Sequence, residues 1–261
     1  MFLCYTYIND YILWILMEAQ FPFHCQKCAN LNMNIPNKKY ADTLIISDIH
    51  LGSDLCRAKE LINIIKKYNF KRLILNGDIF DSLNLKRLHT EHWALLTFIR
   101  KISKKNEVIW IIGNHDGRLV ELSELLGVKM YRKYSWRSNG KKFLAIHGHQ
   151  FDRFLNKNII LSGIAVSFYN IIQKIDTKNR VISRWIKNTN KSWLRLSEEV
   201  ARGAILYAKM NGADYIFCGH THITKYAESK GIKYYNSGCW VLIPSNYITI
   251  DNNDVKIIDV K

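Results

Sequence analysis

The sequence of 261 residues has few prolines, few acidic residues and no long uninterrupted apolar run. Three prolines and a hydrophobic share of 48% exclude a disordered or collagen-like chain. Asp and Glu number 22 against 38 Lys and Arg, so the formal net charge is +16. A charge of this sign predicts an acidic partner, which is a phosphorylated metabolite, a nucleic acid or an anionic membrane surface.

The first forty residues share no motif with the rest of the chain. The opening MFLCYTYINDYILWIL contains Asn9 and Asp10 and falls short of the roughly 20 residues that a membrane-spanning helix needs. It also lacks the basic start and the small-residue cleavage site of a signal peptide. We therefore expect residues 1–40 to form an N-terminal extension of a cytoplasmic protein. An anchor lying in the membrane interface is the alternative.

Cysteines are too scattered to form the dense disulfide framework of a small secreted domain. Cys25 and Cys28 have the spacing of half a zinc knuckle, with His24 beside them, but no second cysteine pair follows. We expect reduced thiols, and the role of the Cys25/Cys28 pair stays open.

From residue 41 onward, short β-branched runs alternate with helical stretches, which indicates βαβ units and a largely parallel inner sheet. Helices are expected at 57–68 and 91–103, where apolar residues recur at helical spacing. Strands are expected at 43–47, 72–76, 108–112, 143–146, 215–218, 233–236, 247–250 and 255–258. The pattern predicts one α/β domain over residues 41–261.

Residues 151–211 interrupt this alternation and contain no convincing strand. Amphipathic helices are expected near 158–174, 178–188 and 194–210. Between residues 151 and 200, nine Lys or Arg residues stand against four acidic ones. We expect a basic helical insertion that caps the domain.

Polar residues concentrate where five of the predicted strands end. The loops read DIH at 48–50, GDIFD at 77–81, GNHD at 113–116, HGH at 147–149 and GHTH at 219–222. Ligands of α/β sheets bind beyond the carboxyl ends of the strands, so these loops are expected to meet at one rim. Glycines beside the polar residues permit a close approach of the backbone.

The residue types in these loops are those that hold metal ions. Asp and Asn supply oxygen ligands, and His supplies nitrogen ligands suited to Mn, Fe, Zn or Ni. The carboxylate of Asp78 can bridge two cations, one on each oxygen. Such a set, with positions left for water and substrate, is typical of a two-metal hydrolase. The candidate ligands are Asp48, His50, Asp78, Asn114, His147, His220 and His222.

Five histidines fall outside this set, and one of them, His115, stands in the GNHD loop. His24, His89 and His92 have no comparable context, and we expect them to be structural. His149 lies in the fourth loop, two residues past a better ligand candidate, and its role stays open.

In this order the motifs DIH, GDIFD, GNHD, HGH and GHTH resemble those of calcineurin-like metallophosphoesterases, with Ile146 where that family has glycine. The resemblance implies a sandwich of two mixed sheets flanked by helices, and two divalent ions, which we expect to be Mn²⁺. It also implies that Asp78 bridges the ions and that His115 lies beside the phosphate as a general acid or charge stabiliser. Asp116 would orient the His115 ring. One ion would be held by Asp48, His50 and His222, and the other by Asn114, His147 and His220.

Within that family, SDIHLGSDLCRA, HGHQFDRF and NSGCW resemble UDP-2,3-diacylglucosamine hydrolases. The resemblance implies cleavage of a nucleotide-lipid diphosphate to UMP and an acylated sugar 1-phosphate, a step of lipid A synthesis, at the cytoplasmic face of the inner membrane. Cys239 and His115 depart from that group, which has an acidic residue and an arginine there. The expected diphosphate-binding residues are Arg153, Lys157, Lys191 and Arg195.

Other readings stay open. Trp185 and Trp193 of the insertion are expected to contact acyl chains or the bilayer, or else to lie in the core. A nuclease or nucleotide phosphodiesterase also suits a charge of +16. A metal-free interaction scaffold on the same fold is the alternative from a different functional class.

Overall fold

A computed structural model describes residues 38–82, 84–117, 120–152 and 191–261. These residues belong to a unit that spans Lys38–Lys261. Most of the predicted N-terminal extension, the Cys25/Cys28 pair and the predicted helices at 158–174 and 178–188 lie outside the described residues. Among the residues that are described, no helix has both the length and the apolarity needed to cross a membrane.

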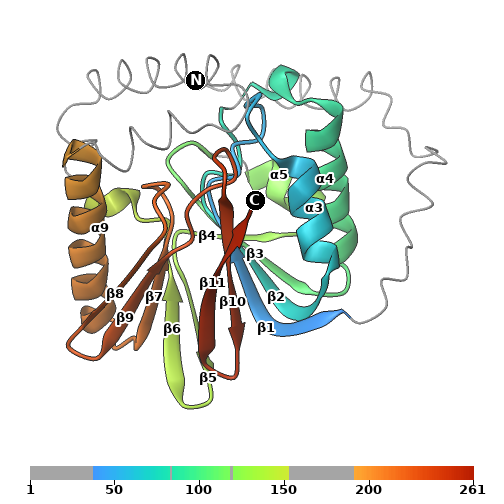
Figure 1. Cartoon of the computed structure of the whole chain (residues 1–261). Coiled ribbons are helices and arrows are strands. Elements are labelled where there is room, and N and C mark those ends of the chain that lie inside the picture. The colour runs from blue at the N-terminus through green and yellow to red at the C-terminus, as the bar shows by residue number, and fades with distance from the viewer. Residues whose placement is uncertain (1–37, 83, 118–119, 153–190) are drawn as a thin grey trace, which may run out of the picture. The chain divides into compact units, whose positions relative to one another are not determined.

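The first sheet has six strands in the order β11-β10-β1-β2-β3-β4. Strands β1 to β4 run parallel, and β10 joins β1 antiparallel, so the last two strands extend the sheet on the other side of β1. The bounds are β1 Lys39–Ile46, β2 Tyr68–Asn76, β3 Glu107–Ile111, β4 Lys129–Tyr131, β10 Ser245–Asp251 and β11 Asp254–Val260. Helices α3 (Ala58–Lys66), α4 (Thr90–Ile102) and α5 (Val120–Leu126) flank this sheet (Figure 1).

The second sheet has five strands in the order β5-β6-β7-β9-β8, with a parallel centre and antiparallel edges. Its strands are β5 Tyr134–Ser138, β6 Lys141–Ala145, β7 Tyr215–Cys218, β8 Lys225–Ser229 and β9 Ile232–Asn236. Helix α9 (Lys191–Met210) runs along it (Figure 1). The short helices η1 (Leu85–Arg87) and η2 (His149–Phe151) lie in connecting segments.

The two sheets pack face to face because side chains alternate along each strand. In β1, Ile45 lies in the cluster between the sheets, while Leu44 and Ile46 lie in the cluster beneath α3 and α4. Phe143 and Phe217 meet Ile45 from the second sheet. A third cluster joins the alanines of α9 to the outer face of that sheet. The layers are therefore helix, sheet, sheet and helix, which confirms the predicted sandwich of two mixed sheets.

Every predicted strand is present, and the predicted helices at 57–68 and 91–103 are α3 and α4. Strands β4, β5 and β8 were not predicted, because they are short edge strands with largely exposed side chains. The predicted helix at 194–210 is α9, but its role in a cap is wrong. Ala204 and Ala208 of α9 are fully buried against the second sheet, so this helix is a layer of the sandwich.

Candidate metal centre

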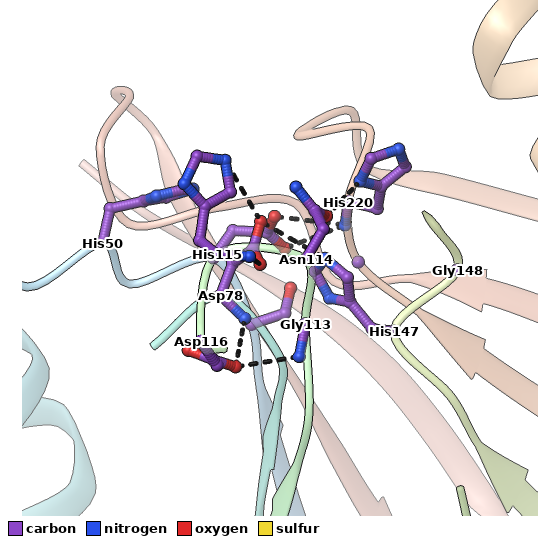
Figure 2. A network of polar contacts seen from close by, with 12 residues as sticks. His50, Asp78, Gly113, Asn114, His115, Asp116, His147, Gly148 and His220 are labelled. Carbon is purple, nitrogen blue, oxygen red and sulfur yellow. Dashed lines mark hydrogen bonds and ion pairs between the residues drawn. The ribbon is translucent and has the colours of Figure 1, made fainter. Parts of the chain in front are cut away.

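The five polar loops meet at one rim, and they come from both sheets. Asp48 and His50 follow β1, Asp78 follows β2, and the segment 113–116 follows β3 of the first sheet. His147 follows β6 and His220 and His222 follow β7 of the second sheet. Figure 2 shows the side chains of Asp78, Asn114 and His147 lying close together, with His50 and His220 on either side. All seven candidate ligands are therefore gathered, as the sequence predicts.

The backbone at this rim is strained. Asp48, His50 and Asp78 each have φ at 52°, and His220 and His222 have φ at 67° and 56°. Non-glycine residues rarely adopt the left-handed region, and each instance costs on the order of 1–3 kcal/mol. Hydrogen bonds between loops maintain it, since the His50 N–H donates to the Asp78 carbonyl at 3.0 Å. Five of the seven candidate ligands thus have a conformation that packing alone does not favour.

One cluster of candidate ligands contains Asp48, His50 and His222. The Nε2 atoms of the two histidines lie 3.1 Å apart, and Nε2 of His222 lies 3.2 Å from Asp48 Oδ1. Burial and the neighbouring His222 lower the pKa of His50 to about 3, so its ring is neutral at ordinary pH. Burial opposes the charge of Asp48, but His222 lowers the pKa of that carboxyl below its usual value. Asp48 as a carboxylate and His50 as a neutral imidazole are in the protonation states in which these side chains bind metal ions.

A second cluster contains Asp78, His147 and His220. His147 Nε2 lies 3.3 Å from Asp78 Oδ2, and His220 Nδ1 lies 3.1 Å from the amide oxygen of Asn114. Asp78 is buried, and although burial alone would raise its pKa, His147 holds that pKa well below the usual value. Asp78 is thus ionised at the centre of the rim.

The protonation of His147 tests whether a cation fits here. Its Nδ1–H donates to the Asn76 carbonyl at 2.8 Å, so the neutral ring presents the lone pair of Nε2 to Asp78. That Nε2 atom is buried and has no hydrogen-bond partner among the described residues. Burial lowers the pKa of His147, but the charges of Asp78 and Asp48 outweigh it and raise the pKa to about 10. A cation between Nε2 and the carboxylate would replace this proton, so the donor set fits a divalent metal.

Asp116 has a different role from the predicted one. Its buried carboxylate accepts the backbone N–H groups of residues 78, 79, 80 and 113 at 2.7 to 3.1 Å, and the Trp110 indole N–H at 3.1 Å. Burial and the charge of Asp78 raise the pKa of Asp116, and these donors oppose that rise. The carboxylate therefore joins the loops after β2 and β3 and does not orient His115, because the donors occupy it (Figure 2).

His115 lies at the exposed side of the rim. Its Nδ1–H donates to the Asp81 carbonyl at 2.8 Å, and its backbone N–H donates to Asp78 Oδ1 at 2.9 Å. Its Nε2 atom lies 4.0 Å from Asp78 Oδ2, and 31% of the side chain is exposed. The Nε2 atom of the ring therefore lies on the side of Asp78, and the Asp81 carbonyl orients the ring in the way predicted for Asp116.

Two glycines permit the close approach of the loops. A Cβ atom at Gly113 would lie 2.2 Å from Asp78 Oδ1, and one at Gly219 would lie 2.3 Å from Asp48 Oδ2. Real Cβ contacts are never this short, so these glycines leave room for the two carboxylates. Glycine is needed at these two positions for its lack of a side chain and not for its backbone freedom, because neither residue has a left-handed backbone.

Two acidic residues at the rim had no predicted role. Asp81 Oδ1 lies 3.7 Å from His50 Nδ1, and its Oδ2 accepts from Arg87 at 2.6 Å. Asp152 is buried, and its Oδ2 lies 3.0 Å from His220 Nε2. Asp81 stands in the GDIFD motif, and that position was the available signal. Asp152 has no signal of its own, because only the fold places it beside His220.

The other predicted residues fall as follows. The buried His92 accepts the backbone N–H groups of Gly52 and His89 through Nδ1, as a structural histidine would. The ring of His149 lies 5.5 Å from that of His147, and burial, followed by His147, lowers its pKa to about 4. Arg195 is exposed on α9, Lys191 is the first residue of that helix, and Arg153, Lys157, His24 and Trp185 lie outside the described residues.

The family model of calcineurin-like phosphoesterases matches residues 42–224 of the chain. Similar solved structures include a predicted phosphoesterase from Streptococcus pneumoniae TIGR4, with 15% identity, a TM-score of 0.40, and 83% of this chain and 87% of that chain covered. An archaeal phosphodiesterase has 16% identity, a TM-score of 0.45 and coverage of 83% and 98%. Vps29 of Chaetomium thermophilum has 9% identity, a TM-score of 0.45 and coverage of 84% and 96%. No curated protein matches the chain.

Proposed function

Because the chain belongs to the calcineurin-like phosphoesterase family and is a metal-dependent phosphoester hydrolase, we propose that it cleaves the diphosphate of UDP-2,3-diacylglucosamine. The products would be UMP and the acylated sugar 1-phosphate. The observation that carries the proposed chemistry is the pair of candidate ligand clusters, one with Asp48 and one with Asp78, each drawn from both sheets. The finer choice of substrate is supported by the motifs SDIHLGSDLCRA and HGHQFDRF.

Each proposed ligand has a defined place in this chemistry. Asp48, His50 and His222 would hold one divalent ion, Asn114, His147 and His220 the other, and Asp78 would bridge them. We propose Mn²⁺, which accepts this mixture of oxygen and nitrogen ligands. When bound, such ions lower the pKa of a coordinated water and neutralise phosphoryl charge.

His115 would act on the leaving group. Its Nδ1 proton is donated to the Asp81 carbonyl, so a second proton on Nε2 makes the ring cationic. A cationic Nε2–H facing the reacting phosphate can stabilise the charge that develops there and can give a proton to the leaving oxygen. The fixed Nδ1 contact orients the ring without a carboxylate partner.

A cavity next to the rim supports a substrate with a bulky organic arm. It has a volume of about 430 Å³ and is lined by His222 and by residues of β8, β10 and β11. Asn246 is one of the lining residues, and it accepts a hydrogen bond from Thr224 at 3.2 Å and donates one to Asp259 at 2.5 Å. Leu242, Pro244 and Ile257 supply apolar wall. A neutral ring with hydrogen-bonding groups, such as a nucleoside, suits this lining better than an acyl chain does.

Of the two departures from the hydrolase group, Cys239 lies in the core. It is buried with Val241 and Leu242, and its difference from the expected acidic residue therefore does not alter the exposed rim. The lipid substrate would place the protein at an anionic membrane, with Arg153, Lys157, Lys191 and Arg195 as proposed diphosphate contacts and Trp193 as a proposed acyl contact.

Release of UMP from UDP-2,3-diacylglucosamine, measured with and without Mn²⁺, tests the proposal. We expect Mn²⁺-dependent release by the wild type, loss of it in Asp78→Ala, and a reduction of about 10²-fold to 10⁴-fold in His115→Ala. Asp254→Asn, an exposed carboxylate that pairs with Lys256, is the matched control and should act as the wild type.

The same assay separates the alternatives. A wild type that cleaves bis(p-nitrophenyl) phosphate or single-stranded nucleic acid, but releases no UMP, would replace the lipid substrate with a nuclease or nucleotide phosphodiesterase function. Full activity of Asp78→Ala would contradict the two-metal site. A protein that binds no metal and cleaves none of these substrates would be an interaction scaffold.

A further inference from the structure

Asp152 and His220 form a buried pair beside the second ligand cluster. Asp152 is 2% exposed, and its Oδ2 lies 3.0 Å from His220 Nε2. The other ring nitrogen of His220, Nδ1, lies 3.1 Å from the Asn114 amide oxygen. The two nitrogens of one ring therefore face two oxygen atoms on opposite sides.

The chemistry of these oxygens determines which nitrogen is protonated in a neutral His220 ring. An ionised carboxylate only accepts hydrogen bonds and attracts the proton more strongly than a neutral amide oxygen does. The proton of a neutral ring therefore lies on Nε2, where Asp152 accepts it, and Nδ1 carries a lone pair. That lone pair and the Asn114 oxygen are then two acceptors 3.1 Å apart, an arrangement that a cation stabilises.

We infer that Asp152 is a positioning residue that keeps the His220 Nδ1 lone pair available to the second divalent ion. This inference rests on the proposed function, because it concerns one of the two ions proposed there. Asp152 itself would touch neither the ion nor the substrate.

The fold holds Asp152 in place independently of any ion. It follows η2 directly, and its backbone N–H donates to the His149 carbonyl at 3.1 Å. The preceding Phe151 lies against α9, where a Cβ atom at Gly203 would come within 2.9 Å of its side chain. Phe151 also contacts Tyr207 of α9, with ring centroids 5.8 Å apart. Helix α9 thus supports the turn that carries Asp152, which gives this helix a link to the rim.

Mn²⁺ titration of the full-length wild type, Asp152→Ala and Asp152→Asn tests the inference. We expect both variants to bind the second Mn²⁺ about 10-fold to 100-fold more weakly, while the first binds within about twofold of wild type. Asp152→Asn is included because its amide can donate to Nε2 and favour the wrong tautomer. Loss of the spin-coupled signal of the Mn²⁺ pair in electron paramagnetic resonance should accompany the weaker binding. Asn114→Ala, which removes a proposed ligand of the same ion, provides the reference for a lost second site.

Two controls separate positioning from general damage. Asp54 and His89 form a similar pair, with Asp54 Oδ1 3.1 Å from His89 Nε2, but on the exposed surface, so Asp54→Asn should bind both ions normally. In the metal-free wild type, long-range ¹H–¹⁵N correlation spectra of the neutral His220 ring should show its proton on Nε2. In Asp152→Ala the two tautomers should mix.

Three results would overturn the inference: unchanged binding of both ions by Asp152→Ala, equal weakening at both sites, or a His220 proton on Nδ1 in the wild type. The proposed function fails separately, if the wild type binds fewer than two ions.

Discussion

In the interior, apolar side chains alternate between the two faces of each strand. At the rim, a few residues further along the same strands, buried charged residues replace them. In β1, Ile45 points to the other sheet and Leu44 to the helices, and both are fully buried. Asp48, three residues beyond Ile45, is equally buried but carries a charge and a left-handed backbone. The same change occurs in β2 between Leu75 and Asp78.

This difference separates what stabilises the fold from what serves the chemistry. Burial of apolar side chains stabilises the interior. Burial of charged groups and positive φ values both cost free energy, and they persist where the surrounding structure and a function maintain them. Substitutions in the interior should therefore reduce stability, and substitutions at the rim should reduce activity.

The largest effect is expected for Asp78→Ala. Loss of the proposed bridge should lower kcat on the order of 10⁴-fold, because a cation site supplies several kcal/mol of transition-state stabilisation. The unfolding temperature of the metal-free variant should stay within a few degrees of wild type. Steady-state kinetics with Mn²⁺ and a thermal melt in chelator check both. A variant that unfolds readily would show that the rim also stabilises the fold.

Asp116→Ala should reduce both stability and activity, since this carboxylate lies between the interior and the rim. Removing it leaves buried N–H groups of two loops and of Trp110 without their acceptor, which should cost roughly 3–5 kcal/mol of unfolding free energy. Activity should fall as well, because the loop carrying Asp78 loses its support. Urea unfolding and kcat test this. Lost activity with unchanged stability would restore the catalytic role predicted from the sequence.

An interior substitution, Phe143→Leu, should reduce stability and leave activity nearly unchanged, the reverse of Asp78→Ala. Phe143 is fully buried and stacks between Trp136 and Tyr215, with ring centroids 5.2 and 4.6 Å away. Losing ring contacts should destabilise the protein by about 1–2 kcal/mol. With saturating Mn²⁺, kcat should remain within about twofold of wild type. A large fall in kcat would mean that the rim depends on the exact packing beneath it.

A graded effect is expected for pH. Because the pKa of His147 is raised from 6.5 to about 10, its metal-free ring is protonated at pH 7, and a binding cation must displace that proton. Affinity for Mn²⁺ at this site should rise about tenfold per pH unit through the neutral range. The protonated ring stabilises the metal-free fold fully below pH 6.5, and this stabilisation is lost as pH rises towards 10. Calorimetry in two buffers of different ionisation enthalpy measures the released proton. An affinity that does not change with pH would contradict a protonated His147 in the metal-free protein.

The sequence predicts the interior and the candidate ligands better than it predicts the supporting contacts. Short β-branched runs indicated the buried strands. Their ends placed Asp48, Asn114 and His147 at one rim, because parallel strands end on the same side. The edge strands β4 and β8 lack that pattern, since their side chains are mostly exposed.

The supporting residues escape prediction for a physical reason. Asp116 stands next to His115 in the chain, yet its carboxylate turns to the backbone of another loop. Asp152 lies 68 residues from His220 and reaches it only through the packing of η2 and α9. Contacts of this kind depend on tertiary placement, and sequence spacing carries no information about them.

Because the candidate ligands come from both sheets, a bound cation would also affect how firmly the sheets hold together. Asp48 and His50 belong to the first sheet and His222 to the second, and the same division separates Asp78 from His147 and His220. Each ion would cross-link the sheets at the end where their apolar contacts stop. Removal of the ions by a chelator would then loosen that end first. An ion present at 100 times its dissociation constant would add about 2.7 kcal/mol to the free energy of unfolding.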